Sequence, residues 1–205
     1  MSYSSDIAFS KTVKAIQSRK GSRSAYAQME KNGSWASEVT PKLREFIAEQ
    51  RSFFLASGNL EGQPYIQHRG GPPGFLKILD KHTMAFADYK GNRQFITQGN
   101  LADNPKAFIF LIDYSRKARV KIWGTAEVIE NDLKLLELLL PAPGEYRAIP
   151  EQIIRFHIEA FDFNCPQHIP QRFEAEDVER ALKEKEREIS ALKKRVRELE
   201  KAIKP

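Results

Sequence analysis

The chain has 205 residues and a mass of 23.5 kDa, with 41% hydrophobic and 29% charged residues, which is typical of one compact domain with a short appendage. Eleven glycines, eleven prolines and thirteen phenylalanines exclude collagen-like, low-complexity and wholly disordered classes. No segment approaches the roughly 18 consecutive apolar residues of a membrane-spanning helix, and residues 1–10 lack the pattern of a secretory signal. We therefore expect a cytoplasmic protein with no membrane partner.

The net charge of +6 and the isoelectric point near 9.3 are compatible with an anionic partner without identifying it. Residues 174–205 carry ten basic and nine acidic side chains, so the excess lies in the rest of the chain, chiefly at 11–23 and 90–121. Residues 11–23 lack interleaved aromatics and any nucleic-acid-binding motif, which favours a solvated helix face. We expect no nucleic-acid partner.

Residues 1–50 are predicted to form helices that pack on the domain that follows. Apolar residues recur there near the helical period, and Gly21 and Gly33 interrupt the pattern. Thr40 stands before Pro41, a capping residue followed by a proline at the first helical position, which marks a helix start.

From residue 51 the apolar residues follow the two-residue period of strands. Residues 52–57 and 64–69 flank a turn and predict a hairpin. Further short strands are expected at 75–79, 83–87, 107–112, 118–129 and 154–160, with a bulge at 161–163. Helices at 93–102 and 132–140 interrupt the strands. Because regular helices do not separate the strands, the pattern favours a mainly β (α+β) fold built on an antiparallel barrel of at least six strands.

The segment 174–205 differs from the barrel region, 51–173. Its apolar residues recur at alternating steps of four and three, with Lys185 as the one polar break: Val178, Leu182, Ile189, Leu192, Val196, Leu199 and Ile203. This seam favours a coiled coil, or docking against a protein partner through residues 177–203. A single solvated helix is the alternative.

Familiar catalytic and metal-binding patterns are missing from the sequence. It contains no nucleophile elbow, zinc-protease helix motif, phosphate-binding loop or dinucleotide fingerprint. The four histidines are not paired at metal-ligand spacing, and Cys165 has no cysteine partner. We predict no metal site and no disulfide, so redox chemistry would require a cofactor.

Three stretches combine glycines with cations and suggest a site for a planar, anionic ligand. In the first, Gly70, Gly71 and Gly74 let the backbone approach a ligand closely. In the second, Asn92 is expected to cap the short helix while Arg93 and the free N–H groups suit a phosphate. In the third, Arg119 and Lys121 share one face of a strand, where they would add charge-assisted bonds or form a solvated outer face.

The chain resembles the pyridoxamine 5'-phosphate oxidase-like FMN-binding split-barrel family between about residues 35 and 173. The resemblance is carried by several short segments in order: QHRGGPPGFLKILD at 67–80, FADYKGNRQ at 86–94, QGNL at 98–101, RVKIWGTA at 119–126 and NCPQHI at 164–169. It implies a six-stranded antiparallel split β-barrel with N-terminal helices and a long C-terminal helix. It also implies a homodimer with one FMN per subunit at the interface.

The resemblance also implies roles for individual residues. Asn92, Arg93 and Gln94 stand where the oxidases have a Ser-Arg-Lys phosphate clamp, so Arg93 would hold the FMN phosphate, and either Lys77 or Arg69 would replace the missing lysine. Backbone groups of Gln67, His68 and Arg69 would border the isoalloxazine ring. Arg119 stands where the oxidases have a glutamine facing the cofactor, and we include Lys121 beside it among the cofactor-binding candidates.

On the substrate side, the resemblance makes Cys165, Gln167 and His168 candidates for lining the site. Cys165 is equally well read as a small buried hydrophobe, and His168 as a proton donor or a hydrogen-bonding wall. The arginine and tryptophan pattern for pyridoxal phosphate is not matched, so the substrate is an unidentified small molecule.

Two function classes follow from the sequence. The first is an FMN-dependent oxidoreductase. The second is a flavin- or haem-binding module or electron carrier without turnover, which docks on a partner through its helical tail; His68 is the residue that makes haem worth testing.

Overall fold

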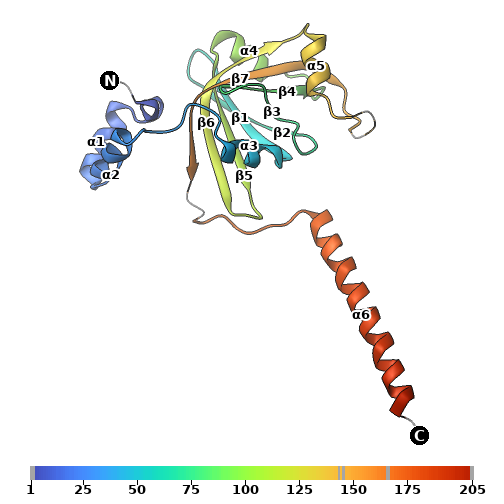
Figure 1. Cartoon of the computed structure of the whole chain (residues 1–205). Coiled ribbons are helices and arrows are strands. Elements are labelled where there is room, and N and C mark those ends of the chain that lie inside the picture. Colours follow the sequence, from blue (N-terminus) through green and yellow to red (C-terminus); the bar gives the residue numbers. More distant parts are fainter. Residues whose placement is uncertain (1–2, 143, 145, 165–166, 204–205) are drawn as a thin grey trace. The chain divides into compact units, whose positions relative to one another are not determined.

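The computed structural model describes residues 3–142, 144, 146–164 and 167–203 (Figure 1). The chain forms two compact units. The first runs up to Asp113 and resumes from Ala118 through the last strand, and the second combines Tyr114–Lys117 with the segment from Gln167 onward. None of the described helices combines the length and the apolar character that a membrane span requires.

The N-terminal region is helical, as predicted. It comprises a short 3-10 helix, η1 (Ser4–Ile7), and three α-helices, α1 (Lys11–Lys20), α2 (Arg23–Lys31) and α3 (Pro41–Ala48). Gly21 ends α1 in the left-handed conformation, with φ of 80°. Thr40 caps α3 by accepting a hydrogen bond from the backbone N–H of Leu43. The predicted helix start at Thr40–Pro41 is confirmed.

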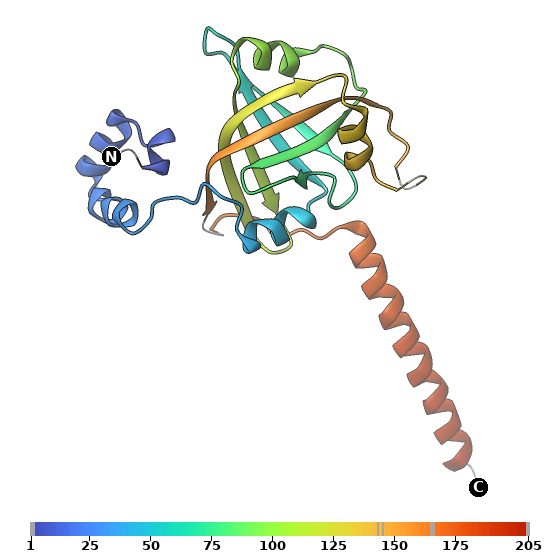
Figure 2. The same ribbon diagram turned by 45° about the horizontal axis from the view of Figure 1, so that its top comes forward.

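Seven antiparallel strands form one sheet in the order β2-β1-β5-β6-β7-β4-β3. The strands are β1 (Ser52–Gly58), β2 (Pro64–Gly70), β3 (Lys77–Ile78), β4 (Thr83–Tyr89), β5 (Lys106–Asp113), β6 (Ala118–Ile129) and β7 (Pro150–Asn164). Figure 2 shows the sheet curling on itself. The predicted class, a mainly antiparallel barrel with N-terminal helices and a long C-terminal helix, is confirmed.

Two local predictions need correction. The strand expected at 75–79 is reduced to Lys77–Ile78, because Phe75 and Leu76 turn into the core instead. The bulge expected at 161–163 lies earlier in β7, where Trp123 pairs with Ala160 and Gly124 with Ile158. A Cβ on Gly124 would stand 1.9 Å from the carbonyl oxygen of His157. The two strands therefore approach so closely at this point that only glycine fits.

The barrel interior is aliphatic and aromatic, and α3 closes part of it with Leu43, Phe46 and Ile47. A second small cluster lies on the other face of β4, where Ala85 and Ala87 pack with Leu139 of α5 (Leu133–Leu139). Residues 84–88 of β4 are therefore buried on both faces, which explains why this strand lacks the usual apolar and polar alternation.

The segment between α2 and α3 contacts β6 and β7. Trp35 stacks on Trp123, with ring centroids 4.7 Å apart, and Ala36 pairs with Phe161. Within the helices, Lys14 contacts both Asp6, at 2.5 Å, and the buried Glu30, at 3.3 Å. These ion pairs join η1, α1 and α2.

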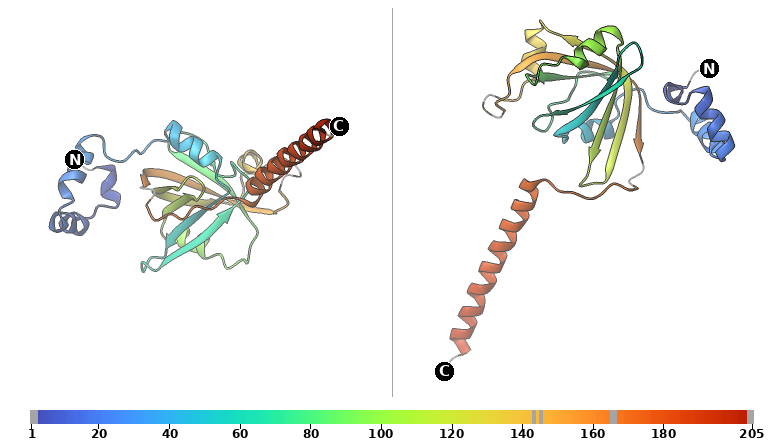
Figure 3. Two further views of the ribbon diagram at one scale, coloured as in Figure 1. Left: turned by 90° about the horizontal axis from the view of Figure 1, so that it is seen from below. Right: turned by 180° about the vertical axis from the view of Figure 1, so that it is seen from behind.

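The second unit contains α6 (Ala175–Ile203), a single continuous helix (Figure 3). The segment that precedes it hydrogen-bonds to the turn between β5 and β6: Gln171 donates to the carbonyl oxygen of Ser115 at 3.1 Å, and the guanidinium of Arg172 lies 4.8 Å from the ring centroid of Tyr114.

Candidate functional site

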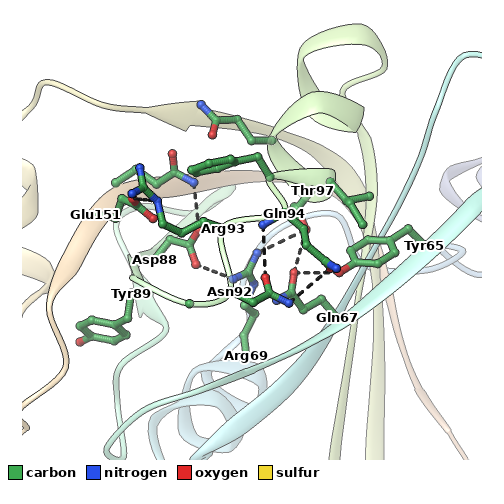
Figure 4. A pocket seen from close by; sticks show the side chains of 15 residues that line it. Tyr65, Gln67, Arg69, Asp88, Tyr89, Asn92, Arg93, Gln94, Thr97 and Glu151 are labelled. Atoms are coloured by element: carbon green, nitrogen blue, oxygen red, sulfur yellow. Dashed lines mark hydrogen bonds and ion pairs between the residues drawn. The ribbon is translucent and has the colours of Figure 1, made fainter.

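A polar cavity lies where β2, β4 and β7 meet the loop that enters α4 (Ile96–Asp103) (Figure 4). The side chains that line it include members of all these elements: Tyr65, Gln67, Arg69, Asp88, Tyr89, Asn92, Arg93, Gln94, Thr97, Glu151 and Gln152. Its volume is about 50 Å³. Sites for small organic ligands are typically about 300–1,000 Å³, so one chain provides a wall of such a site and not an enclosure.

Alternation along β2 separates its side chains into two sets. Tyr65, Gln67 and Arg69 face the cavity, whereas Ile66 and His68 are exposed on the opposite face. This separation follows from the two-residue period of a strand. Two of the three predicted residues of this segment therefore reach the cavity, and the side chain of His68 lies against the ring of Phe54 instead, at 5.6 Å.

Arg69 is the most firmly held cation of the cavity. Its Nη1 donates to Asp88 Oδ1 at 2.5 Å, and its Nη2 donates to Thr97 Oγ1 at 3.3 Å. Gln152 donates to the other carboxylate oxygen of Asp88 at 2.9 Å. The Nε of Arg69 is buried and has no hydrogen-bond partner among the described residues. A buried N–H donor without an acceptor is rare in native proteins, so this atom is available to an acceptor on a ligand.

Gln67 is oriented by two hydroxyl groups. Its side-chain oxygen accepts a hydrogen bond from Thr97 Oγ1 at 3.2 Å and another from the Tyr65 hydroxyl at 3.3 Å. Because the oxygen receives both bonds, the amide NH2 is left on the opposite side as a donor. Gln67 and Arg69 thus give neighbouring donors from one strand.

The loop that enters α4 differs from the prediction. We expected Asn92 to cap a helix starting at Arg93, but the helix starts at Ile96, and Asn92 instead accepts from the backbone N–H of Gln94 at 3.3 Å. Arg93 and Phe95 have φ of 59° and 54°. Left-handed residues interrupt the helical hydrogen-bond pattern, so the helix begins only after them.

The side chain of Arg93 lies at the rim of the cavity and is 57% exposed. Its guanidinium carbon lies 5.5 Å from the ring centroid of Phe95, and its Nε lies 3.5 Å from Glu151 Oε1. Glu151 is the extra residue of a bulge in β7, between partners of Asp88 and Tyr89. Bulges change the direction in which side chains point, and this one brings the carboxylate of Glu151 to Arg93, the residue predicted to bind the phosphate.

The charges of the cavity balance, because two arginines face two carboxylates: Arg69, Arg93, Asp88 and Glu151. Tyr89 adds a phenol whose pKa is raised above its ordinary value by burial and, to a lesser extent, by the neighbouring Tyr146. Tyr89 therefore presents an uncharged phenol to the cavity at physiological pH.

The remaining predicted residues do not line this cavity. Lys77 lies half-buried on β3, and Arg119 and Lys121 lie on the outer face of β6. Lys121 pairs with Asp162 at 3.1 Å and lies over the Trp123 ring, while the buried Nε of Arg119 has no hydrogen-bond partner among the described residues.

Two residues that were predicted to line the substrate side of the site belong to the second unit. Gln167 and His168 are exposed in a turn there, with His168 at φ 63°. Cys165 lies outside the described residues.

Sequence reasoning missed four residues that organise the cavity: Asp88, Thr97, Glu151 and Gln152. A signal existed for Asp88, since it is an acidic residue inside an apolar strand and such a group needs a buried partner. The other three have no local pattern that marks them.

The model of the pyridoxamine 5'-phosphate oxidase family matches residues 39–165. This is more than half of the chain, and the protein belongs to that family. No curated protein matches the chain.

Solved structures are similar to the chain at low sequence identity. HupZ of Group A Streptococcus is 19% identical with a TM-score of 0.50, covering 66% of this chain and 99% of its own. An FMN-binding protein from Syntrophomonas wolfei subsp. wolfei is 10% identical with a TM-score of 0.49, covering 75% and 97%. HutZ, the heme storage protein from Vibrio cholerae, is 17% identical with a TM-score of 0.41, covering 60% and 92%. At 19% identity the similarity to HupZ extends to the fold alone.

Proposed function

We propose that the chain binds FMN at the cavity beside Arg69 and acts as a flavin-dependent oxidoreductase on a small substrate. The observation that carries the proposal is the buried Nε of Arg69, which has no hydrogen-bond partner within the described part of the chain. Asp88 and Thr97 hold this guanidinium next to a loop that bears a second arginine. The donors that the cavity offers fit the group, because the edge of a flavin ring presents oxygen and nitrogen acceptors and its phosphate presents anionic oxygens. FMN supplies electron or hydride transfer when bound.

In this proposal Gln67 and Arg69 bind and orient the ring edge. The Nε of Arg69 and the amide of Gln67 are donors held in place by other side chains, so they lose little freedom on binding. The positive charge of Arg69 stabilises negative charge at that edge, and the bonded carboxylate of Asp88 reduces this effect. The Arg69–Asp88 pair would therefore adjust how readily the bound flavin accepts electrons.

Arg93 is the proposed phosphate ligand. It is exposed at the rim, and its contact with Glu151 is long, at 3.5 Å. Exposed ion pairs of this kind contribute about 0–1 kcal/mol, so a phosphate dianion can replace the carboxylate. Replacing Arg93 with alanine should weaken FMN binding by about 2–3 kcal/mol, or about 30- to 150-fold, because a charge-assisted bond is lost.

We further propose that the FMN site is completed by a second subunit in a homodimer. The cavity of one chain, about 50 Å³, is too small to enclose the ligand. The outer face of the β1–β5 ladder carries Phe54 paired with Phe110 and Ala56 paired with Phe108, with Ile66 of β2 61% exposed beside them. Such an apolar outer face suits a subunit interface. It lies on the face of β2 opposite to Gln67 and Arg69, so it supports the dimer, while the small cavity volume supports completion of the site by the partner.

A second candidate function is a carrier of flavin or haem without turnover. His68 supports a test for haem, because its ring is exposed on the outer face of β2 and neutral imidazole is a common iron ligand.

The experiment is to purify the full chain, record its absorption from 300 to 600 nm, and identify any released chromophore by mass. Apoprotein is then titrated with FMN and with riboflavin, which lacks the phosphate. The proposal expects flavin bands, a preference for FMN that Arg93→Ala removes, and reduction by NADH or NADPH. Flavin binding without reduction or turnover would favour the carrier, a sharp band near 410 nm would favour haem, and failure to bind FMN would refute the proposal.

A further inference from the structure

Helix α6 presents a stripe of apolar side chains to solvent. Every residue of the helix whose side chain is described is exposed. Six apolar residues of the stripe are 44–59% exposed: Val178, Leu182, Ile189, Leu192, Val196 and Leu199. A long exposed apolar stripe on one side of a charged helix marks an interaction surface.

The spacing of these residues defines a heptad register. Steps of three and four alternate when Leu182, Ile189 and Val196 are assigned to position a, and Val178, Leu192 and Leu199 to position d. Ile203 continues position a in the sequence, and Lys185 takes the remaining d position. The stripe therefore extends over more than three heptads with one interruption.

The residue types at these positions distinguish between assemblies. In the C-terminal half, position a holds the β-branched Ile189 and Val196, while position d holds Leu192 and Leu199. β-branched residues at a with leucine at d favour two parallel strands over three or four.

The flanking charges are complementary between two copies of this helix in parallel. Position g of one helix lies next to position e of the following heptad in the other. This places Glu188 beside Lys193 and Arg195 beside Glu200 of the other copy, on both sides of the pair. The remaining e–g pair within the helix combines Ala181 with Glu186 and has no repulsion.

An antiparallel pair is less favourable. If the same apolar positions are superposed in opposite directions, Glu186 meets Lys193 and Glu188 meets Arg195 of the other copy, but Glu179 lies beside Glu200 at each end of the pair, a repulsion that the parallel pair does not have. Like charges at such positions destabilise a pair. The far side of the helix, position f, holds only cations in the form of Arg180, Arg187, Lys194 and Lys201, which suits a face that stays in water.

Lys185 is the one position that opposes pairing. Its Nζ contacts Glu188 Oε2 at 2.8 Å. Because Glu188 is at position g, this contact draws the ammonium toward the flank and away from the centre of the seam. A single polar residue at the core lowers stability and fixes the register of the strands.

We propose that α6 pairs with α6 of a second copy of this chain as a parallel, in-register, two-stranded coiled coil. This inference goes beyond the proposed function and does not rest on flavin binding. The occupant of the exposed stripe is then the same stripe of the other chain.

The test uses the full chain with Cys165→Ser, so that one added cysteine reports proximity. Leu199→Cys stands at position d, and Lys201→Cys, two residues away at position f, is the matched control. Each variant is oxidised in a glutathione buffer, and the covalent dimer is followed on non-reducing gels. A third sample mixes Leu182→Cys and Leu199→Cys chains, because antiparallel helices would bring these two positions together.

We expect Leu199→Cys to form the covalent dimer about tenfold faster than Lys201→Cys, owing to the raised effective concentration across the seam. Adding Leu192→Asp, a charge at position d, to Leu199→Cys should abolish this difference in the rate of covalent dimer formation. Equal slow rates for both single variants would overturn the proposal. Preferential linkage in the mixed Leu182→Cys and Leu199→Cys sample would overturn the parallel arrangement. Each result is independent of whether FMN binds.

Discussion

Replacing Glu151 with glutamine tests whether the rim of the cavity is a phosphate site. Glu151 Oε1 lies 3.5 Å from Arg93 Nε, with side chains 29% and 57% exposed. A phosphate at Arg93 must displace this carboxylate, which opposes binding by up to about 1 kcal/mol for an exposed pair. Repulsion between the two anions at about 4 Å adds about 1 kcal/mol in water. Glu151→Gln should therefore tighten FMN binding by about 1–2 kcal/mol, or about five- to thirtyfold.

The assay is fluorescence titration of the apoprotein with FMN and riboflavin at low and high salt. Riboflavin affinity should not change, because it carries no phosphate, and the gain for FMN should shrink as salt screens the exposed charges. Glu127→Gln is the matched control, since it removes the same charge from an exposed pair with Arg155 on the same barrel outside the cavity. The phosphate assignment is refuted if Glu151→Gln leaves FMN affinity unchanged, or if Glu127→Gln tightens it equally.

Three further predictions concern stability. Asp88→Asn should lower the free energy of unfolding in urea by about 3 kcal/mol, because it leaves the charge of Arg69 buried without its carboxylate; a loss under 1 kcal/mol would contradict the assigned role of the pair. Gly124→Ala should destabilise the fold by about 3 kcal/mol, since the new Cβ would meet a backbone oxygen at 1.9 Å. Gly99→Ala, in an open position of α4, should instead stabilise the fold by up to about 1 kcal/mol. Shifts of the melting temperature in the same direction for both variants would be inconsistent with this packing. The pKa of Asp6 lies below its ordinary value, chiefly through its hydrogen bond from Lys14. The contribution of Asp6 to stability is therefore present above about pH 4 and is lost as the pH falls through the lowered pKa. Tryptophan fluorescence should report loosening of the N-terminal helices in that acidic range, and Asp6→Asn should remove the transition.

The strands and helices of the barrel region could be predicted because their patterns are local. The hairpin of β1 and β2 follows from alternating side chains around a turn, and its observed register runs from Ser52 with Gly70 to Gly58 with Pro64. The start of α3 at Thr40–Pro41 depends on a capping hydroxyl and a proline, which act within one turn of helix.

The errors arose where the backbone conformation of the loop or a distant contact outweighs the local pattern. Asn92 is a good helix cap by type, yet it caps a turn because two left-handed residues follow it. The position of the bulge in β7 is set by the approach of β6 at Gly124, which the sequence of β7 does not encode.

The sequence by itself determined the type of most elements and the two faces of β6, because periodicity and caps are properties of neighbouring residues. The sequence also indicated five cofactor-binding candidates that line one cavity: Gln67, Arg69, Asn92, Arg93 and Gln94. Only the tertiary structure decided how those side chains are held. Asp88 fixes Arg69 from another strand, and Glu151 reaches Arg93 through a bulge in β7. Such pairings depend on strand order and register, which join residues 19 and 58 positions apart and leave no mark on the local sequence.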